Sequence, residues 1–511
     1  MNKTQTLLLE AYKSFKSQQY HDVIEKTEKV LKIKYDIDAL ILNGIAYFHT
    51  DNLTKAEQSL KLAIKERPVD TSVQMYLLEI YSQTNQNEEG IKLIQSSNPS
   101  NDLIKNAHIK FLQINGHYTS AIKLAKSMPE NIFTIETLAW NYELTNDLEH
   151  AGLYSCKGIK LDATSFKCNL VKAKLKLRNK NYQQANKAIK KISKEKLSCQ
   201  NQSIYYSVKA QIKEKQKKFK KAFKYYTLSN SSLKQTKAYE QLTGQSFYSM
   251  STVAQLKQYY QLKPQFKNLT PSKQAITFML GLPRSGTTLL ENILNSHSEI
   301  QTIEEKPTID SLLNNSLDFT NLTNTIKDLT VEDIKKIQKS YVKARNAYCS
   351  EKTKIVIDKM PLNIIHIGLL YRIFPNAKFI ISTRDLRDTA LSCYFQNFKL
   401  NDAMVNFLDW EQTKHYLSSV KQLGDYCQTL YPLNTIIVPY ERLVIEPFCQ
   451  VKKILKFMNL DWQNSMLNYR EKITGKNILT PSYTKVSEKI TTSYLNKWHN
   501  YRTFVNFNFD L

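Results

Sequence analysis

Residues 1 to 230 repeat one pair of positions, usually an aromatic residue or Leu followed three positions later by a small residue, at an interval close to 34 residues. The pairs are Tyr20 and Val23, Leu53 and Ala56, Asn87 and Gly90, Tyr118 and Ala121, Leu148 and Ala151, Tyr182 and Ala185, and Phe219 and Ala222. A period of this length is typical of stacked helical hairpins, because one hairpin cannot bury its apolar face without its neighbours. The first half of the chain is therefore predicted to be an α-helical solenoid.

The residue types in each pair fit the second helix of a hairpin. The aromatic or Leu side chain begins that helix and packs into the first one, and the small residue lets the two helices approach closely. Polar turns such as 179–181 (Asn-Lys-Asn) separate the helices. The pattern resembles tetratricopeptide repeats, in five to seven copies. That resemblance implies either a scaffold that binds a protein partner or a platform for stability and oligomerisation, and both remain open.

A different pattern begins near residue 273. Residues 231–272 read as a helical junction, and four short apolar runs then follow at 276–280, 354–358, 378–382 and 435–438, separated by helical segments. Strands and helices in alternation predict a parallel sheet with helices on both faces, and ligands bind at the carboxyl ends of such strands. We therefore expect a tetratricopeptide-like helical domain at 1–230, a junction at 231–272 and an α/β domain at 273–511.

The first apolar run is followed directly by GLPRSGTT at positions 281–288. Gly281 and Gly286 allow the backbone to turn sharply, and the helix that begins near Leu289 directs its N–H groups at an oxyanion. The P-loop of ATPases carries a Lys where this chain has Thr287, and here Arg284 supplies the positive charge. The loop is therefore P-loop-like but does not fit an ATPase.

The distribution of charge agrees with an anion site in the second half. The formal charge is +26, yet only ten of the 72 basic residues are Arg, and eight of these lie at or after Arg284. Arg pairs with phosphate or sulfate in a bidentate manner, so its retention in a Lys-rich chain indicates a geometric need. The Lys excess predicts solvated helix faces, and the sequence contains no recognised nucleic-acid module.

Cysteine usage and the apolar segments indicate a cytoplasmic protein. The seven cysteines are scattered and form no CxxC pair, which gives no zinc or redox signature and favours a reducing compartment. The first apolar run is three Leu residues long, too short for a signal-peptide core. No stretch approaches the roughly 18 apolar residues that a membrane span requires.

With the motifs downstream, PRSGTT at 283–288 resembles the sulfotransferase superfamily. Within it, the chain is most similar to the group that contains protein-tyrosine sulfotransferases and bacterial tetratricopeptide-repeat sulfotransferases. The resemblance covers residues 272–505, and the repeats match the bacterial two-part architecture. In this family the loop holds the 5′-phosphosulfate of 3′-phosphoadenosine 5′-phosphosulfate (PAPS). The resemblance therefore implies these PAPS ligands: Arg284, Ser285, Gly286, Thr287 and Thr288.

The resemblance also implies the catalytic groups. An acceptor hydroxyl must lose its proton as it attacks sulfur, so the site needs a general base. The family places this Glu eight residues after a His, which is Glu305 after His297 here, with the neighbouring Glu304 as the fallback. Lys359 matches the catalytic Lys, whose ammonium can stabilise charge on the leaving phosphate. Ser482 falls where protein-tyrosine sulfotransferases have a catalytic Ser, and Arg284 is the remaining catalytic residue.

A second anion site is predicted at Arg384 and Ser392. Arg384 follows the third apolar run, and Ser392 lies eight residues later on the next helix. The pair resembles the family's 3′-phosphate site, although Gln396 stands where protein-tyrosine sulfotransferases have a further Arg. Tyr440, after the fourth run, is expected either to contact the nucleotide or to pack in the core.

The resemblance implies direct in-line transfer of a sulfuryl group from PAPS to a hydroxyl, with Glu305 as base and no metal. A peptide tyrosine, a glycan or a small molecule remains open as the acceptor, and the repeats could bind a protein partner. Two other readings are a nucleotide kinase or NTPase with a variant P-loop, and a non-catalytic repeat scaffold with a degenerate enzyme domain. The first of these would need the loop Lys that the chain lacks.

Overall fold

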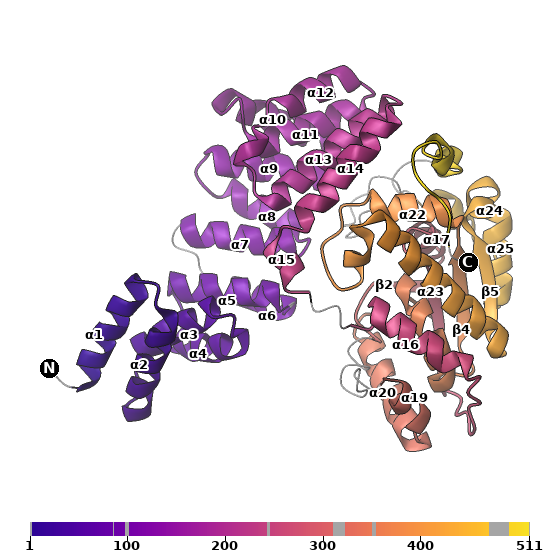
Figure 1. The fold of residues 1–511 in the computed structure, drawn as a ribbon, viewed down its shortest axis with the longest axis horizontal. Helices are drawn as coiled ribbons and strands as arrows, with labels where there is room; N and C mark the ends of the chain where they lie inside the picture. Colours follow the sequence, from indigo (N-terminus) through magenta and orange to yellow (C-terminus); the bar gives the residue numbers. More distant parts are fainter. Residues whose placement is uncertain are drawn as a thin grey trace. The chain divides into compact units, whose positions relative to one another are not determined.

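The computed structural model describes residues 3–84, 86–97, 102–242, 246–309, 322–349, 354–469 and 490–509. The chain forms two compact units, Met1–Leu175 and Lys176–Leu511. The first unit is helical, and the second contains further helices and one β-sheet (Figure 1). The predicted fold class, a tetratricopeptide-like helical region followed by an α/β domain with a central parallel sheet, is confirmed.

The repeat pattern corresponds to helices α1 to α14. Their bounds are α1 Lys3–Lys16, α2 Tyr20–Ile33, α3 Ile37–His49, α4 Leu53–Glu66, α5 Thr71–Gln83, α6 Asn87–Ser96, α7 Asp102–Ile114, α8 Tyr118–Lys126, α9 Ile132–Leu144, α10 Leu148–Leu161, α11 Phe166–Arg178, α12 Tyr182–Lys190, α13 Cys199–Lys215 and α14 Phe219–Leu233. Every even-numbered helix begins at the first residue of a predicted pair. The small residue of each pair is buried, as close helix packing requires.

The turns before these helices share one backbone geometry. In six of them, the residue two positions before the second helix has a positive φ. These residues are Gln18, Asp51, Gly116, Asn146, Lys180 and Lys217. A left-handed residue ends the first helix, because it lets the chain reverse while the last carbonyls are satisfied. The next residue often caps the following helix, as Asn181 does when its side chain accepts from the Gln184 N–H at 3.1 Å.

The α/β part contains a parallel five-stranded sheet in the order β2-β3-β1-β4-β5. The strands are β1 Thr277–Gly281, β2 Ile300–Glu304, β3 Ile355–Lys359, β4 Lys378–Thr383 and β5 Asn434–Pro439. The remaining helices are α15 Lys237–Glu240, α16 Met250–Gln261, α17 Thr287–Leu294, α19 Leu322–Asp328, α20 Val331–Asn346, α21 Ile367–Ile373, α22 Leu386–Tyr394, α23 Trp410–Leu430, α24 Tyr440–Ile445 and α25 Pro447–Phe457. Four strands fall on the predicted apolar runs, and β2 was not predicted.

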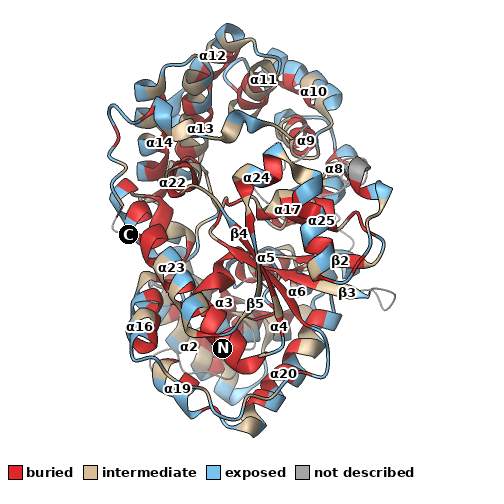
Figure 2. Cartoon of the chain, turned by 90° about the vertical axis from the view of Figure 1, so that its right-hand side faces the viewer, coloured by how far each residue is buried: buried red, intermediate tan, exposed pale blue. Residues whose placement is uncertain are grey.

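Alternate strand residues enter two cores, one on each face of the sheet. Phe278, Leu280 and Phe379 pack in the larger core with side chains of α16, α20, α21 and α23. Met279 and Ile380 point the other way and pack in a core with α17 and α25. Buried residues, red in Figure 2, accordingly run through the central strands and along the inner sides of these helices. Burial on both faces is expected for a parallel sheet.

The last repeat hairpin shares the larger core with the sheet. Tyr226 of α14 stacks on Phe395 with ring centroids 3.9 Å apart, and Phe223 stacks on Tyr394 at 5.3 Å. The Asn230 side-chain amide donates to the Tyr394 carbonyl at 3.0 Å. Helix α14 thus packs against the end of α22 within the second compact unit, whereas the repeat pattern in the sequence continues to residue 230. The division at 1–230, 231–272 and 273–511 stays a prediction.

Candidate functional site

The predicted site residues lie along the carboxyl edge of the sheet. Because all five strands are parallel, their carboxyl ends share one edge, and strand order fixes the sequence of groups there. Glu305 directly follows β2, and Lys359 is the last residue of β3. The glycine loop follows β1 in the centre of the sheet, and Arg384 follows β4. Neighbouring strands lie about 4.8 Å apart, so β2 and β4 are separated by roughly 14 Å. The chain connections diverge between β1 and β4, which is where such sheets bind ligands.

The central loop has the backbone that its glycines predict. Gly281 and Gly286 have φ values of +154° and +98°, and a Cβ on Gly281 would lie 2.4 Å from the Ser382 carbonyl oxygen. Gly286 precedes the first residue of α17, where backbone N–H groups lack helical partners. The Ser285 hydroxyl at this helix start is buried and has no hydrogen-bond partner among the described residues. Free donors at a helix N-terminus form an oxyanion site.

Replacing Gly281 with Ala is expected to destabilise the second compact unit and to abolish anion binding by the loop. The cost is at least about 1–3 kcal/mol for the backbone conformation alone, and the Ser382 backbone cannot move aside without disturbing β4. Thermal unfolding measures the loss. Gly152→Ala is the matched control, because its added methyl would meet only the Leu175 side chain at 3.6 Å. Equal effects of the two changes would contradict the prediction.

The residues assigned to the two ends of PAPS contact each other. Arg284 has a φ of 66°, and its Nε donates to the Ser392 hydroxyl at 3.1 Å. Arg384 donates to the Arg284 carbonyl at 3.1 Å and lies over the Tyr440 ring, 4.6 Å from its centroid. Burial lowers the pKa of the Arg284 guanidinium, with the nearby Arg384 acting in the same direction. Two guanidinium groups in a poorly solvated place are stabilised by an anion.

The segment 490–509 closes around this end of the site. Arg384 donates from a second nitrogen to the Tyr494 carbonyl at 2.7 Å, while its Nε is buried without a partner among the described residues. The Trp498 N–H donates to the Asp388 carboxylate at 2.9 Å. Burial raises the pKa of that Asp388 carboxyl. Backbone contacts therefore hold Arg384 in position, and sequence motifs carry no signal for such contacts.

The other end of the site is a buried ion cluster around Lys359. Its side chain is fully buried, and Nζ lies 2.7 Å from Glu305 Oε1 and 3.9 Å from Glu304 Oε1. Nζ also lies 3.1 Å from Glu291 Oε2, a contact that the motifs did not predict. Burial opposes the charge of Lys359, but Glu305, Glu291 and Glu304 outweigh burial and raise the pKa of the ammonium. The predicted base and the predicted catalytic Lys are thus hydrogen-bonded to each other.

Two further predictions concern His297 and Ser482. His297 is buried, its Nε2 lies 3.0 Å from the Asp461 carbonyl oxygen, and its Nδ1 accepts from the Glu299 N–H at 3.1 Å. Both ring nitrogens of His297 therefore bond to backbone groups. Ser482 lies outside the described residues.

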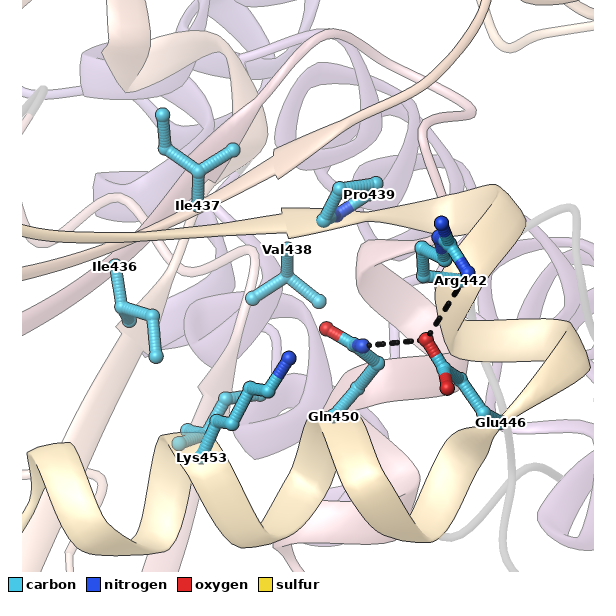
Figure 3. Close-up of a pocket in the computed structure, with 9 residues that line it drawn as sticks. Ile436, Ile437, Val438, Pro439, Arg442, Glu446, Gln450 and Lys453 are labelled. Carbon is cyan, nitrogen blue, oxygen red and sulfur yellow. Dashed lines mark hydrogen bonds and ion pairs between the residues drawn. The ribbon is translucent and has the colours of Figure 1, made fainter.

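A separate pocket of about 460 Å³ lies between β5 and α25 (Figure 3). Ile436 and Val438 point from β5 toward α25, and Ile437 points to the opposite face. Glu446 accepts from the Gln450 amide at 3.1 Å and lies 3.6 Å from Arg442. None of the predicted site residues lines this pocket.

The glycine loop, the adjoining guanidinium groups and the Lys–Glu cluster lie at one edge of the sheet, where they provide hydrogen-bond donors suited to an oxyanion and a hydrogen-bonded Lys–Glu pair. The model of the sulfotransferase family matches residues 277–464, which include all these groups. This part of the chain is similar to the sulfotransferase family, and the resemblance inferred from the motifs is confirmed.

Similar proteins include a protein-tyrosine sulfotransferase and an uncharacterized protein. Protein-tyrosine sulfotransferase A of Caenorhabditis elegans is 26% identical over 225 residues, which are 42% of this chain and 57% of that protein. An uncharacterized protein of Aquifex aeolicus is 31% identical over 243 residues, or 46% of this chain and 32% of that protein. The chain thus spans 57% of the first relative's length and 32% of the second's.

Among solved structures, the sulfotransferase domain of the Synechococcus PCC 7002 olefin synthase is 19% identical. That alignment covers 48% of this chain and 92% of that domain, with a TM-score of 0.33. Within the described residues, no helix combines the length and the apolar character needed to cross a bilayer.

Proposed function

We propose that the protein is a PAPS-dependent sulfotransferase that transfers a sulfuryl group to an acceptor hydroxyl. The observation that carries the proposal is the order of groups along the sheet edge. Glu305 and Lys359 lie on one side of the glycine loop, and Arg384 lies on the other. The acceptor and the base then meet at the β2–β3 side, and the nucleotide extends toward β4 and β5. The family match supports this reading.

The residues present fit a donor with phosphate at one end and phosphosulfate at the other. The Ser285 hydroxyl, which has no partner in the described part of the chain, and the N-terminus of α17 supply donors for the 5′-phosphosulfate, together with Thr287 and Thr288. The buried Nε of Arg384, which likewise meets no acceptor among the described residues, suits the 3′-phosphate, with Ser392 nearby on α22. Tyr440 lies against both Gly286 and Arg384, which favours a place beside the nucleotide.

Glu305 acts as the base. Its carboxylate is exposed and can therefore meet an acceptor hydroxyl, whereas the Lys359 side chain is fully buried. When bound, PAPS supplies a sulfuryl group whose transfer to the acceptor oxygen breaks the bond to the 5′-phosphate, which departs with the electron pair. Glu305 takes the proton of the acceptor hydroxyl. Lys359, Arg284 and the loop N–H groups stabilise the negative charge that spreads over the sulfuryl oxygens and the leaving phosphate. Held in a fixed geometry, these groups lower the barrier mainly by positioning and electrostatics.

A peptide tyrosine is the first acceptor to test, because several matching relatives are protein-tyrosine sulfotransferases. The helical repeats then present the acceptor chain to the site. A glycan or small-molecule hydroxyl is the alternative acceptor class. We place the protein in the cytoplasm, because the cysteine pattern favours a reducing compartment.

Radiolabelled PAPS incubated with a mixed pool of tyrosine peptides, glycans and phenols tests the activity. Transfer of label to a member of the pool supports the proposal, and the labelled product identifies the acceptor class. Absence of PAPS binding, or binding without turnover while ATP is hydrolysed, overturns it. The ATP arm covers the kinase or NTPase alternative, which lacks support from the loop because Thr287 replaces the Lys.

Replacing Arg384 with Ala is expected to weaken binding of 3′-phosphoadenosine 5′-phosphate (PAP) about 10- to 100-fold, since a hydrogen bond to a charged group contributes about 1.5–3 kcal/mol. Isothermal titration calorimetry measures the change. Arg442→Ala is the matched control, because Arg442 is exposed and pairs with Glu446 beside the separate pocket. Unchanged PAP affinity in the Arg384 variant would remove this residue from the phosphate site.

A further inference from the structure

Glu291 is a buried acid that no sequence motif brings into the site. It lies on the inner side of α17 and is 5% exposed. One carboxylate oxygen accepts from the Thr302 hydroxyl of β2 at 3.1 Å, and the other lies 3.1 Å from Lys359 Nζ. Burying a carboxylate costs folding free energy unless the charge is paired. The contact of Glu291 with the buried Lys359 ammonium is therefore a specific interaction.

Lys359 is thereby held between two carboxylates of different surroundings. Glu305 is partly exposed and reaches the ammonium from the end of β2, whereas Glu291 is enclosed and reaches it from α17. Glu304 is farther away, and Arg284 is a second cationic group that interacts electrostatically with Glu305. Burial raises the pKa of the Glu291 carboxyl to about 7, and Lys359 acts in the opposite direction.

We propose that Glu291 is a positioning residue that keeps the Lys359 ammonium charged and in place while Glu305 takes up the acceptor proton. The inference rests on the proposed function, because it assigns Glu305 as the base. When the proton moves from the acceptor oxygen to a Glu305 oxygen, Glu305 becomes neutral and its attraction for Lys359 falls. Glu291 takes no proton from the substrate, and at pH values above about 7, where its carboxyl is ionised, it remains the charged partner of Lys359 at 3.1 Å. The ammonium therefore stays available to the leaving phosphate at the moment when charge develops there.

The charge of Lys359 can be measured without turnover. Because the side chain is fully buried, its protonation is followed in place by the NMR shift of Nζ in lysine-labelled protein between pH 7 and 10, assigned from the spectrum of a Lys359→Arg variant. Because Glu291 is one of the carboxylates that raise the pKa of Lys359, Glu291→Gln lowers that pKa and moves the titration of Nζ to lower pH. Glu291→Asp keeps the negative charge and leaves the titration near that of the wild type.

Kinetics then separate position from charge. Both variants are expected to lower kcat about 10- to 100-fold, because a misplaced catalytic group costs this much, while PAP affinity changes less than about twofold. In Glu291→Gln the alkaline limit of kcat also moves to lower pH, and in Glu291→Asp it does not. Glu143→Gln is the matched control, since Glu143 is likewise buried and pairs with Lys174 at 2.7 Å in the first compact unit. Its kcat and its Lys359 titration are expected to stay at wild-type values.

A wild-type Nζ titration and wild-type kcat in Glu291→Gln would overturn the inference. If that variant does not fold, wild-type kcat in Glu291→Asp overturns it equally, because the shorter side chain withdraws the carboxylate from Lys359. Failure of the proposed function is distinct, since a wild-type chain that transfers no label from PAPS rejects that function. In that case the Nζ titrations still show whether Glu291 sets the charge of Lys359.

Discussion

A Glu305→Gln variant is expected to bind PAP normally and to transfer sulfuryl groups about 10²–10⁴-fold more slowly than the wild type, which is the usual contribution of a general base. In the wild type, Lys359 Nζ lies 2.7 Å from a Glu305 carboxylate oxygen. The amide of the variant keeps the shape of the side chain and can still accept this hydrogen bond, but it cannot take the acceptor proton. Single-turnover assays with radiolabelled PAPS measure the chemical step directly. Titration of PAP in parallel shows whether the site is intact.

The neighbouring residue provides the control. Glu304 ends β2 and lies 3.9 Å from Lys359, so it contributes a weak attraction but no short hydrogen bond to the ammonium. Glu304→Gln is expected to change kcat less than about fivefold, in line with about 1 kcal/mol for a loose, partly exposed pair. The reverse result, full activity in the Glu305 variant and a large loss in the Glu304 variant, would move the base assignment to Glu304.

The helical repeats could be predicted nearly to the residue because they depend on local chemistry. An aromatic or Leu residue at the start of a helix and a small residue one turn later describe contacts within a hairpin, such as those of Tyr182 and Ala185. Strand β2 could not be predicted in the same way. Its sequence, Ile-Gln-Thr-Ile-Glu, has only two apolar residues, and it becomes a strand by pairing with β3.

In the site too, residues within motifs could be predicted, and contacts between distant segments could not. Arg284, Lys359, Glu305 and Arg384 were all found from motifs, and the structure brings them to one edge because parallel strands end together. Contacts made by the backbone of distant segments, such as the Tyr494 carbonyl with Arg384, leave no trace in a motif. Glu291 did leave a signal. It interrupts the buried stripe of α17 between Leu290 and Leu294, and a charged residue in an apolar stripe indicates a buried partner.

Deleting residues 1–230 is expected to leave an α/β domain that does not fold, whereas a chain lacking residues 1–175 keeps its fold and binds PAP. The reason is the aromatic core that α14 shares with the end of α22, where Tyr226 stacks on Phe395. Removing one buried aromatic side chain costs about 3–5 kcal/mol, against a total stability of about 5–15 kcal/mol. The chain without residues 1–230 loses several buried aromatic side chains of α14 at once. Their partners Tyr394, Phe395 and Tyr501 would become exposed. Thermal unfolding and PAP titration measure both outcomes.

A point variant tests the same contact in the full-length chain. Tyr226→Ala is expected to destabilise the second compact unit by about 3–5 kcal/mol and to weaken PAP binding, because α22 carries Ser392 and begins just after Arg384. Tyr81→Ala removes an equally buried tyrosine from the first compact unit and is expected to leave PAP binding unchanged. If the chain lacking residues 1–230 folded and bound PAP as the longer one does, the last hairpin would be an independent repeat. Its aromatic contacts with α22 would then contribute nothing to the cofactor site.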